Sequence, residues 1–244
     1  MKKSLTLRVS IAALLISGAA IFVGAQERKP AVKQNTRERQ AAIPPVVTTD
    51  AAAAEAVSYS YEFTKPEFYI RHIVLEHDGA GRGKISFERQ GDLEPIVEPI
   101  ELSESSRARI TALWAALRFL DSDVSYQSEK QFPQLGTMRL GMQRGLKTRT
   151  AEFNWTHDPG AKALVDEYRR AANQAIFIFD ITLARQNQPL NSPKLMDQLD
   201  KYVARGELSD PQQLVPLLRE LTTDERIPLM ARNHAGRILK KLEK

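Results

Sequence analysis

Cysteine is absent from the 244-residue sequence, and histidine occurs only four times. A chain without cysteine cannot be stabilised by disulfides, bind zinc through thiolates or use a cysteine nucleophile. The Gly-x-Ser-x-Gly, Ser-x-x-Lys and His-Glu-x-x-His patterns of common hydrolase families are also missing. An enzyme would therefore need a catalytic site assembled from residues that are distant in the sequence.

Long hydrophobic runs are rare as well, and the clearest one lies near the N-terminus. Two lysines and an arginine precede an apolar or small stretch from Val9 to Val23. This stretch of about 15 residues is shorter than the roughly 20 that a membrane-spanning helix needs. With its basic start it is typical of a secretory signal peptide. We therefore expect residues 1–25 to be a signal cleaved after Ala25, and the protein to be periplasmic or secreted. The alternative is an uncleaved N-terminal membrane anchor, and the membrane would be contacted only through this segment.

Residues 26–57 contain almost no large apolar side chain and mix charged residues with proline and alanine. Such a segment cannot bury enough apolar surface to offset the entropy lost on ordering. We expect it to be a disordered leader or linker, and the folded part to span 58–244.

The net charge of +5 lies mostly outside this folded part. The signal has three basic residues and no acid, and the leader has five basic and four acidic residues. Residues 58–244 then carry 27 basic and 26 acidic side chains. A nearly neutral domain behind an export signal disfavours nucleic acid as a partner, since phosphate binding depends on an excess of basic side chains.

The first half of the folded part has the pattern of β-strands. Apolar and polar residues alternate in 58–63, 84–88, 138–142 and 151–155, and 67–77 is rich in β-branched and aromatic residues. A glycine-rich turn at 78–83 predicts one hairpin, and Gly145 marks the turn of a second. Pro95 and Pro99 indicate a short strand or an edge strand between them.

Helices are expected between and after these hairpins. Ser103 is placed as the N-cap of a helix, and Asp158 with Pro159 opens a long one that ends before Pro189. Three shorter helices are expected to start at 192, 210 and 224. We therefore predict an α+β fold: residues 58–186 form an antiparallel sheet of two hairpins packed against helices. An α-helical C-terminal subdomain, 187–244, follows.

The last two of these helices resemble a single HEAT-type helix pair. The resemblance rests on the segment 214–218 and on apolar or small residues at Ile227, Ala231, Ala235 and Ile238. One such pair cannot form a solenoid, which needs neighbouring repeats to bury its faces. The resemblance implies helix packing and a surface that could bind a protein.

A cluster of polar residues near the first hairpin is the main candidate for a site. His72, Glu76 and His77 follow the order of an inverted zincin motif, but three residues instead of two separate His72 from Glu76, on a predicted strand. Strand alternation places His72 and Glu76 on one face and His77 on the other. We predict no metal and no catalytic set. His72, Glu76, His77, Asp78 and His157 remain candidate binding residues.

The glycine-rich segment 79–86 is close to a phosphate-binding loop without matching it. That motif requires a glycine where Asp78 stands and a serine or threonine where Ile85 stands. It also requires a following helix, whereas a strand is expected here. We predict a hairpin turn, and no nucleotide or other cofactor.

Aromatic residues gather at the start of the folded part, at Tyr59, Tyr61, Phe63, Phe68 and Tyr69. Aromatic side chains on an open sheet could bind a sugar or a peptide. We favour the simpler interpretation that they form the core beneath a helix.

These observations favour an exported, non-catalytic protein of the bacterial cell envelope that binds a protein or another envelope ligand. The alternative is a hydrolase of envelope polymers with a site built from residues that are far apart in the sequence.

Overall fold

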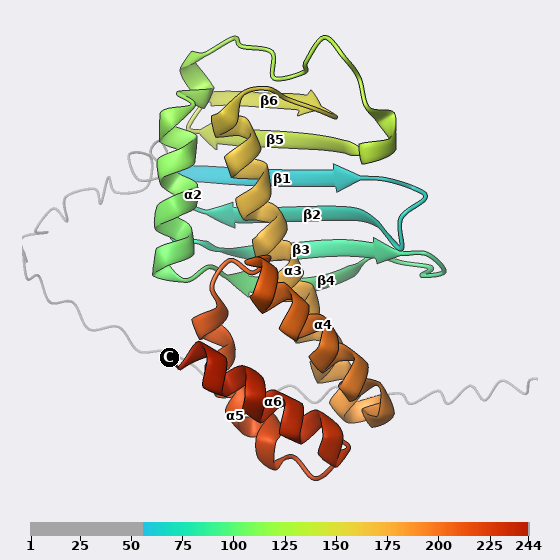
Figure 1. Cartoon of the computed structure of the whole chain (residues 1–244). Coiled ribbons are helices and arrows are strands. Elements are labelled where there is room, and N and C mark those ends of the chain that lie inside the picture. Colours follow the sequence, from blue (N-terminus) through green and yellow to red (C-terminus); the bar gives the residue numbers. More distant parts are fainter. Residues whose placement is uncertain (1–55, 244) are drawn as a thin grey trace, which may run out of the picture. The chain divides into compact units, whose positions relative to one another are not determined.

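Six antiparallel strands form one sheet in the computed structural model, which describes residues 56–243 (Figure 1). The expected signal peptide and all but the last two residues of the expected leader lie outside the described residues. Val57 already belongs to the first strand, one residue earlier than expected. The fold is α+β, as predicted.

The strands lie in the order β4-β3-β2-β1-β5-β6. The two expected hairpins are present as β2–β3 and β5–β6, and β1 joins them by pairing with both β2 and β5. The strand containing Pro99 lies at an edge, as predicted. The bounds are β1 Val57–Thr64, β2 Ile70–Asp78, β3 Arg82–Arg89, β4 Ile96–Glu101, β5 Thr137–Arg144 and β6 Lys147–Phe153.

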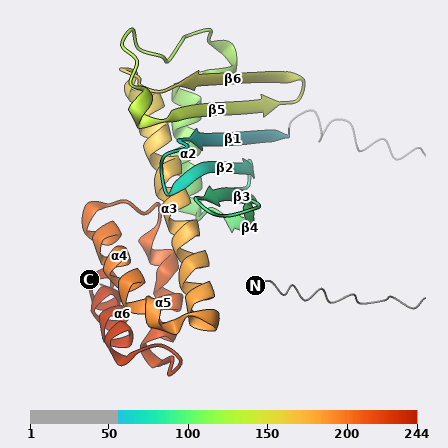
Figure 2. The ribbon, with the colours of Figure 1, turned by 90° about the vertical axis from the view of Figure 1, so that its right-hand side faces the viewer.

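One face of the sheet is apolar and the other is polar, because successive side chains of a strand point in opposite directions. Tyr61, Leu75 and Leu140 lie side by side on the apolar face and are fully buried. Ser60 and its neighbour Gly141 lie on the polar face. Two helices cover the apolar face only (Figure 2).

Of the five aromatic residues at the domain start, Phe63 is partly buried and packs against the core, and the other four divide into two groups. Tyr59 and Tyr61 are core residues, as predicted. Phe68 and Tyr69 are 46% and 66% exposed, because a turn and not a strand precedes β2. In that turn the Phe68 amide donates to the carbonyl of Lys65. The prediction that 67–69 belong to the strand was therefore wrong.

The covering helices are α2, Glu104–Ala116, and α3, Pro159–Asn187. They begin where expected, because the side chains of Ser103 and Asp158 accept hydrogen bonds from the first-turn amides of these helices. α3 crosses the sheet and continues past β4 (Figures 1 and 2). Its C-terminal half therefore has sides that no strand covers.

Three further helices pack on this C-terminal half: α4, Ser192–Arg205, α5, Val215–Thr223, and α6, Leu229–Leu242. Phe177 and Ile181 of α3 are buried in the same core as the inward side chains of these helices. Short 3-10 turns occupy Phe119–Asp121, Pro133–Leu135, Pro189–Asn191 and Pro211–Leu214. None of the helices within 56–243 combines the length and apolarity needed to cross a membrane.

The last helix begins later than predicted. Asp224 is the C-cap of α5, and α6 starts only at Leu229. Pro228 keeps the residue before it away from the helical conformation and itself serves as N-cap. Ile227 is nevertheless buried, so the connecting loop contributes to the core. α5 and α6 pack against each other in that core, as the resemblance to a HEAT-type pair implied.

Candidate functional site

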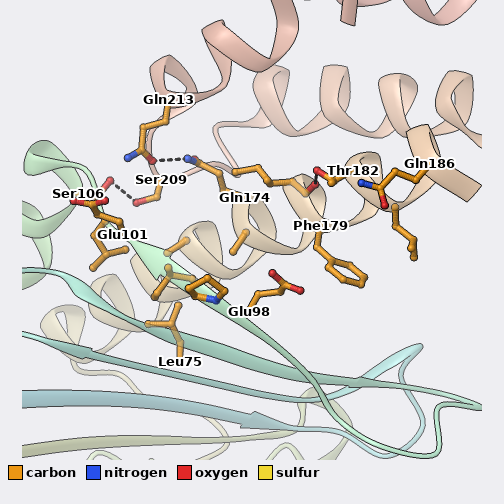
Figure 3. A pocket seen from close by; sticks show the side chains of 17 residues that line it. Leu75, Glu98, Glu101, Ser106, Gln174, Phe179, Thr182, Gln186, Ser209 and Gln213 are labelled. Carbon is orange, nitrogen blue, oxygen red and sulfur yellow. Dashed lines mark hydrogen bonds between the residues drawn. The ribbon is translucent and has the colours of Figure 1, made fainter. Parts of the chain in front are cut away.

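A cavity of about 370 Å³ lies where β4, the C-terminal half of α3 and the segment 209–213 meet (Figure 3). We call it the edge groove. Its lining includes apolar side chains from the sheet and from α3, such as Ile100 and Phe179. Glu98 and Glu101 are the charged residues among its lining. The groove thus combines apolar side chains with neutral polar ones, and its two acidic residues lie on the strand.

The groove borders the edge of β4 and also reaches the apolar face of the sheet, where Leu75 of β2 lines it. Its lining contains five consecutive residues, 98–102. A cavity above one face of a strand would contact only every second residue, because side chains alternate. The edge itself, with its backbone groups, therefore borders the groove.

The direction of the β4 backbone groups follows from one hydrogen bond. The amide of Leu102 donates to the carbonyl of Gly81, at 2.9 Å, on the side of β3. In an antiparallel ladder the residues that bond to one neighbour recur every second position. Val97, Pro99 and Glu101 therefore direct their backbone groups away from β3, and proline fits there because it has no amide proton to pair.

No described strand pairs with this side of β4. The edge thus offers the amide groups of Val97 and Glu101 and the carbonyl groups of all three outward residues. Such an unpaired row is a template for another strand.

α3 contributes an uncovered apolar stripe beneath this edge. Ile178, Phe179 and Leu183 line the groove, and Ile178 and Leu183 are 38% and 41% exposed. The opposite side of the same helical segment carries Phe177 and Ile181, which the C-terminal helices bury. The stripe is therefore additional to the apolar surface that the fold itself needs.

An ion pair holds this part of α3 against the sheet. Arg89, at the end of β3, pairs with Asp180, and both side chains are mostly buried. The Arg89 guanidinium also lies 5.0 Å from the ring of Phe87 and 5.7 Å from that of Phe179. Burial raises the pKa of Asp180, and the charge of Arg89 opposes this effect. The pair fixes one wall of the groove relative to the strands.

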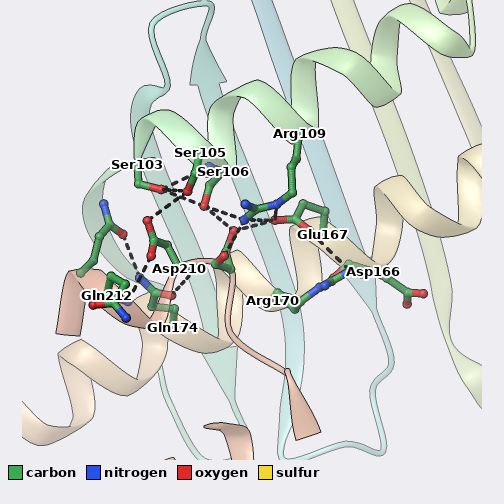
Figure 4. Close-up of polar contacts among 12 residues, drawn as sticks. Ser103, Ser105, Ser106, Arg109, Asp166, Glu167, Arg170, Gln174, Asp210 and Gln212 are labelled. Atoms are coloured by element: carbon green, nitrogen blue, oxygen red, sulfur yellow. Dashed lines mark hydrogen bonds and ion pairs between the residues drawn. The ribbon is translucent and has the colours of Figure 1, made fainter. Parts of the chain in front are cut away.

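A buried polar cluster closes the groove at the end near α2 (Figure 4). Glu167 of α3 is almost fully buried and accepts hydrogen bonds from Arg109 Nη2 at 2.9 Å and Ser209 Oγ at 2.8 Å. Ser209 Oγ also lies 2.8 Å from Ser106 Oγ. Arg170 approaches the second oxygen of Glu167 at 3.4 Å. The cluster joins α2, α3 and the segment that leads into α5.

Side-chain amides make further hydrogen bonds between α3 and the segment that leads into α5. Gln174 accepts a hydrogen bond from the amide of Asp210 and donates one to Gln213, at 2.9 and 2.8 Å. Ser105 donates to the carboxylate of Asp210 at 3.2 Å. These contacts fix the position of the segment 209–213 and so the shape of the groove.

The cluster is poorly suited to nucleophilic catalysis. A serine nucleophile requires a neighbouring base that can accept its proton. The carboxylate next to Ser209 already interacts with Arg109 and Arg170. Positioning of the C-terminal helices is the role that this geometry supports.

Two of the sequence-predicted site residues lie on the open polar face of the sheet. His72 contacts Glu62 and Glu88, with nitrogen–oxygen distances of 3.0 and 3.3 Å. Glu76 pairs with Lys84 at 3.1 Å. Both residues therefore take part in polar contacts between neighbouring strands.

Of the other three, His77 and Asp78 border the same cavity as Glu76, and His157 lies apart from them. His77 is 4% exposed beneath α3, on the opposite face from His72, as predicted. Asp78 stabilises the glycine turn by accepting from the amides of Ala80 and Arg82, at 2.9 Å each. His157 is exposed in the loop before α3. The five residues do not form one site, and within 56–243 no group of His, Asp and Glu side chains could hold a metal ion.

The edge groove was missed by the sequence analysis, although two signals pointed to it. Pro99 marked an edge strand. The segment 175–183 of α3 is apolar on more sides than one covering sheet can bury. No local sequence pattern revealed that the edge strand and this apolar segment of α3 lie side by side. No protein-family model and no curated protein sequence matches this chain, so the geometry of the groove is the basis for a functional proposal.

Proposed function

We propose that this is an exported, non-catalytic binding protein that takes up an extended polypeptide segment in the edge groove by strand addition. One observation carries the proposal: the unpaired edge of β4 lies directly beside the uncovered apolar stripe of α3. In strand addition, backbone hydrogen bonds to a free edge supply affinity, and pockets for alternate side chains supply specificity.

The groove specifies the chemistry of its occupant. An added strand would pair with the outward groups of Val97, Pro99 and Glu101. Every second side chain would face α3, where Ile178 and Leu183 favour aliphatic residues. The two lining carboxylates favour a basic residue in the segment. The expected occupant is an extended segment with alternating aliphatic residues and at least one lysine or arginine.

The alternative of an envelope-polymer hydrolase gains no support from the groove. Its two carboxylates, Glu98 and Glu101, are separated by an odd number of positions on one strand and so project from opposite faces. Acid–base pairs of glycoside hydrolases must face each other across a cleft. The signal-like N-terminus supports export and an envelope partner.

The proposal can be tested with a synthetic heptapeptide of alternating valine and threonine that has a lysine at each end. Calorimetric titration is expected to show saturable binding to the protein. Methylation of the peptide amides on one side of the strand should abolish binding, and methylation on the other side should not, because only one side pairs with β4.

Substitutions of residues that line the groove provide a second test of peptide binding. Ile178→Lys and Leu183→Lys are each expected to weaken binding more than tenfold, since they place a charge under the apolar side chains of the peptide. Leu190→Lys is the matched control, because Leu190 is 84% exposed and outside the groove. Equal affinity of all three variants and the unchanged protein would refute the proposal.

A further inference from the structure

A second cavity, of about 360 Å³, lies at the N-terminal end of α3 and shares no lining residue with the edge groove. It is bounded by the loop before β2, the segment before β5, Trp155 and the first turns of α3. Its volume lies at the lower end of the range for small-molecule sites, about 300–1,000 Å³. We call it the aromatic pocket.

Four aromatic side chains line this pocket. Phe63, Phe68, Phe153 and Trp155 line it together with Met138. The rings of Phe63 and Phe68 are tilted by 45° with their centres 6.0 Å apart. Phe68 is nearly half exposed, so a ligand could reach the interior past it. Aromatic walls with a methionine between them favour a flat aromatic guest.

The pocket is held open by contacts between its two loops. Lys65 donates to the carbonyl of Pro133 at 3.4 Å and pairs with Glu67 at 2.7 Å. Gly136 has a φ of +85°, and a Cβ there would lie 2.7 Å from the ring of Phe63. Only glycine allows the segment before β5 to approach Phe63 so closely. The wall is therefore preformed and does not depend on a ligand.

The charged residues of the pocket all come from α3. Lys162, Asp166 and Arg169 line it on successive turns. Asp166 pairs with Arg169 at 3.3 Å. Among residues 56–243, Lys162 has no carboxylate within ion-pair distance. The lining thus has one positive charge in excess, beside an aromatic interior.

We propose that the aromatic pocket binds a small aromatic carboxylate. The ring would lie among Phe63, Phe68 and Trp155, and the carboxylate would accept hydrogen bonds from the Lys162 ammonium. A charge-assisted bond of this kind is stronger than one between neutral groups. The site is independent of strand addition at β4, and either can exist without the other.

The probe for this site is 4-phenylbutyrate, and 4-phenylbutan-1-ol is its uncharged analogue. Methionine methyl groups labelled with ¹³C report the position of binding, because Met138 lines the pocket and Met196 is buried in the C-terminal core. Phenylbutyrate is expected to shift the Met138 signal saturably and to leave that of Met196 in place. The alcohol should produce the same pattern with about tenfold weaker affinity.

Two substitutions separate the roles of charge and ring. Lys162→Ala should weaken phenylbutyrate about tenfold and the alcohol less than twofold. Phe68→Ala should weaken both ligands. Lys194→Ala, on the exposed side of α4, is the matched control and should change neither affinity. An unshifted Met138 at 10 mM phenylbutyrate, on the order of the weakest useful affinities, would overturn the proposal. The proposal would also be overturned if the acid and the alcohol bound with equal affinity and Lys162→Ala changed neither affinity.

Discussion

The Tyr168 hydroxyl lies 2.9 Å from Nε2 of His77 and joins α3 to β2 within the core. The indole Nε1 of Trp114 also lies 2.9 Å from this hydroxyl and can only donate to it. Nδ1 of His77 donates to the carbonyl of Asp78, at 2.8 Å. The hydroxyl proton therefore goes to Nε2, and His77 is neutral with its proton on Nδ1.

Removal of the Tyr168 hydroxyl should destabilise the protein. Tyr168→Phe leaves Nε2 of His77 and the Trp114 N–H buried without partners, which costs about 1–3 kcal/mol. Urea unfolding of the variant is expected to show this loss. Tyr69→Phe, at a mostly exposed tyrosine, should stay within about 0.5 kcal/mol of the unchanged protein. A loss no larger in Tyr168→Phe than in Tyr69→Phe would contradict the network.

His77 should also make stability depend on pH. Burial lowers its pKa below the usual value of 6.5, and Asp78 opposes this effect only in part. The aromatic side chains that contact it, Tyr59 and Tyr168, carry no charge. Because the folded state favours neutral histidine, this stabilisation is complete above pH 6.5 and is lost as the pH falls through the folded pKa.

The measurement is the free energy of unfolding of the unchanged protein and of His77→Gln between pH 7.5 and pH 5. The difference between them should shrink as the pH falls, because the glutamine does not titrate. Comparison of the two proteins removes the contribution of the other histidines. A difference that is constant over this range would show that His77 has the same pKa in both states.

The buried Glu167 should be essential for the attachment of the C-terminal helices. Glu167→Ala removes the shared carboxylate of Arg109 and Arg170 and the acceptor of Ser209, and because both arginines are partly exposed the expected cost is about 1–3 kcal/mol. Thermal unfolding should report the loss. Asp166→Ala, the preceding and more exposed position, should cost less than about 1 kcal/mol. Similar effects of the two variants would contradict the positioning role.

Asp224 should stabilise the helical part at all but acidic pH. Hydrogen bonds from Arg226 and then from Arg185 hold the pKa of this carboxyl well below its usual range. A lowered folded pKa gives stability that is complete above about pH 4 and is lost as the pH falls through the folded value.

Asp224→Asn is expected to cost about 1–2 kcal/mol at pH 7, measured by denaturant unfolding. The cost should diminish below pH 4, where the unchanged protein loses the same interaction. Asp123→Asn, at an exposed loop position, should have little effect at either pH. A cost that persists undiminished at pH 2.5 would argue against an ionised Asp224 as its source.

The strands and helices were predictable where local chemistry decides them. Ser103 and Asp158 cap helices, and Gly145 turns a hairpin, through contacts with residues a few positions away. The turn before β2 was missed because its aromatic residues have high strand propensity, although they lie in a turn outside the core. The start of the last helix was missed because the capping potential of Asp224 outweighed the signal of Pro228.

The candidate site was far less predictable. The edge groove depends on how far α3 extends past β4, a relationship between residues 98–102 and 175–186. Strand alternation instead placed the predicted polar residues on opposite faces of the sheet. His72 lies on the open face beside Glu62 and Glu88, and His77 points into the core. A motif search could not find the groove, because backbone groups and aliphatic side chains form most of it.

Amide hydrogen exchange along β4 tests strand addition most directly. In the free protein the amides of Glu98 and Ile100 face β3 and should exchange slowly, whereas those of Val97 and Glu101 face the groove and should exchange fast. Saturation with the alternating heptapeptide is predicted to slow Val97 and Glu101 at least about tenfold, as new backbone bonds form. Binding of the peptide that leaves exchange at Val97 and Glu101 unchanged would contradict strand addition at β4.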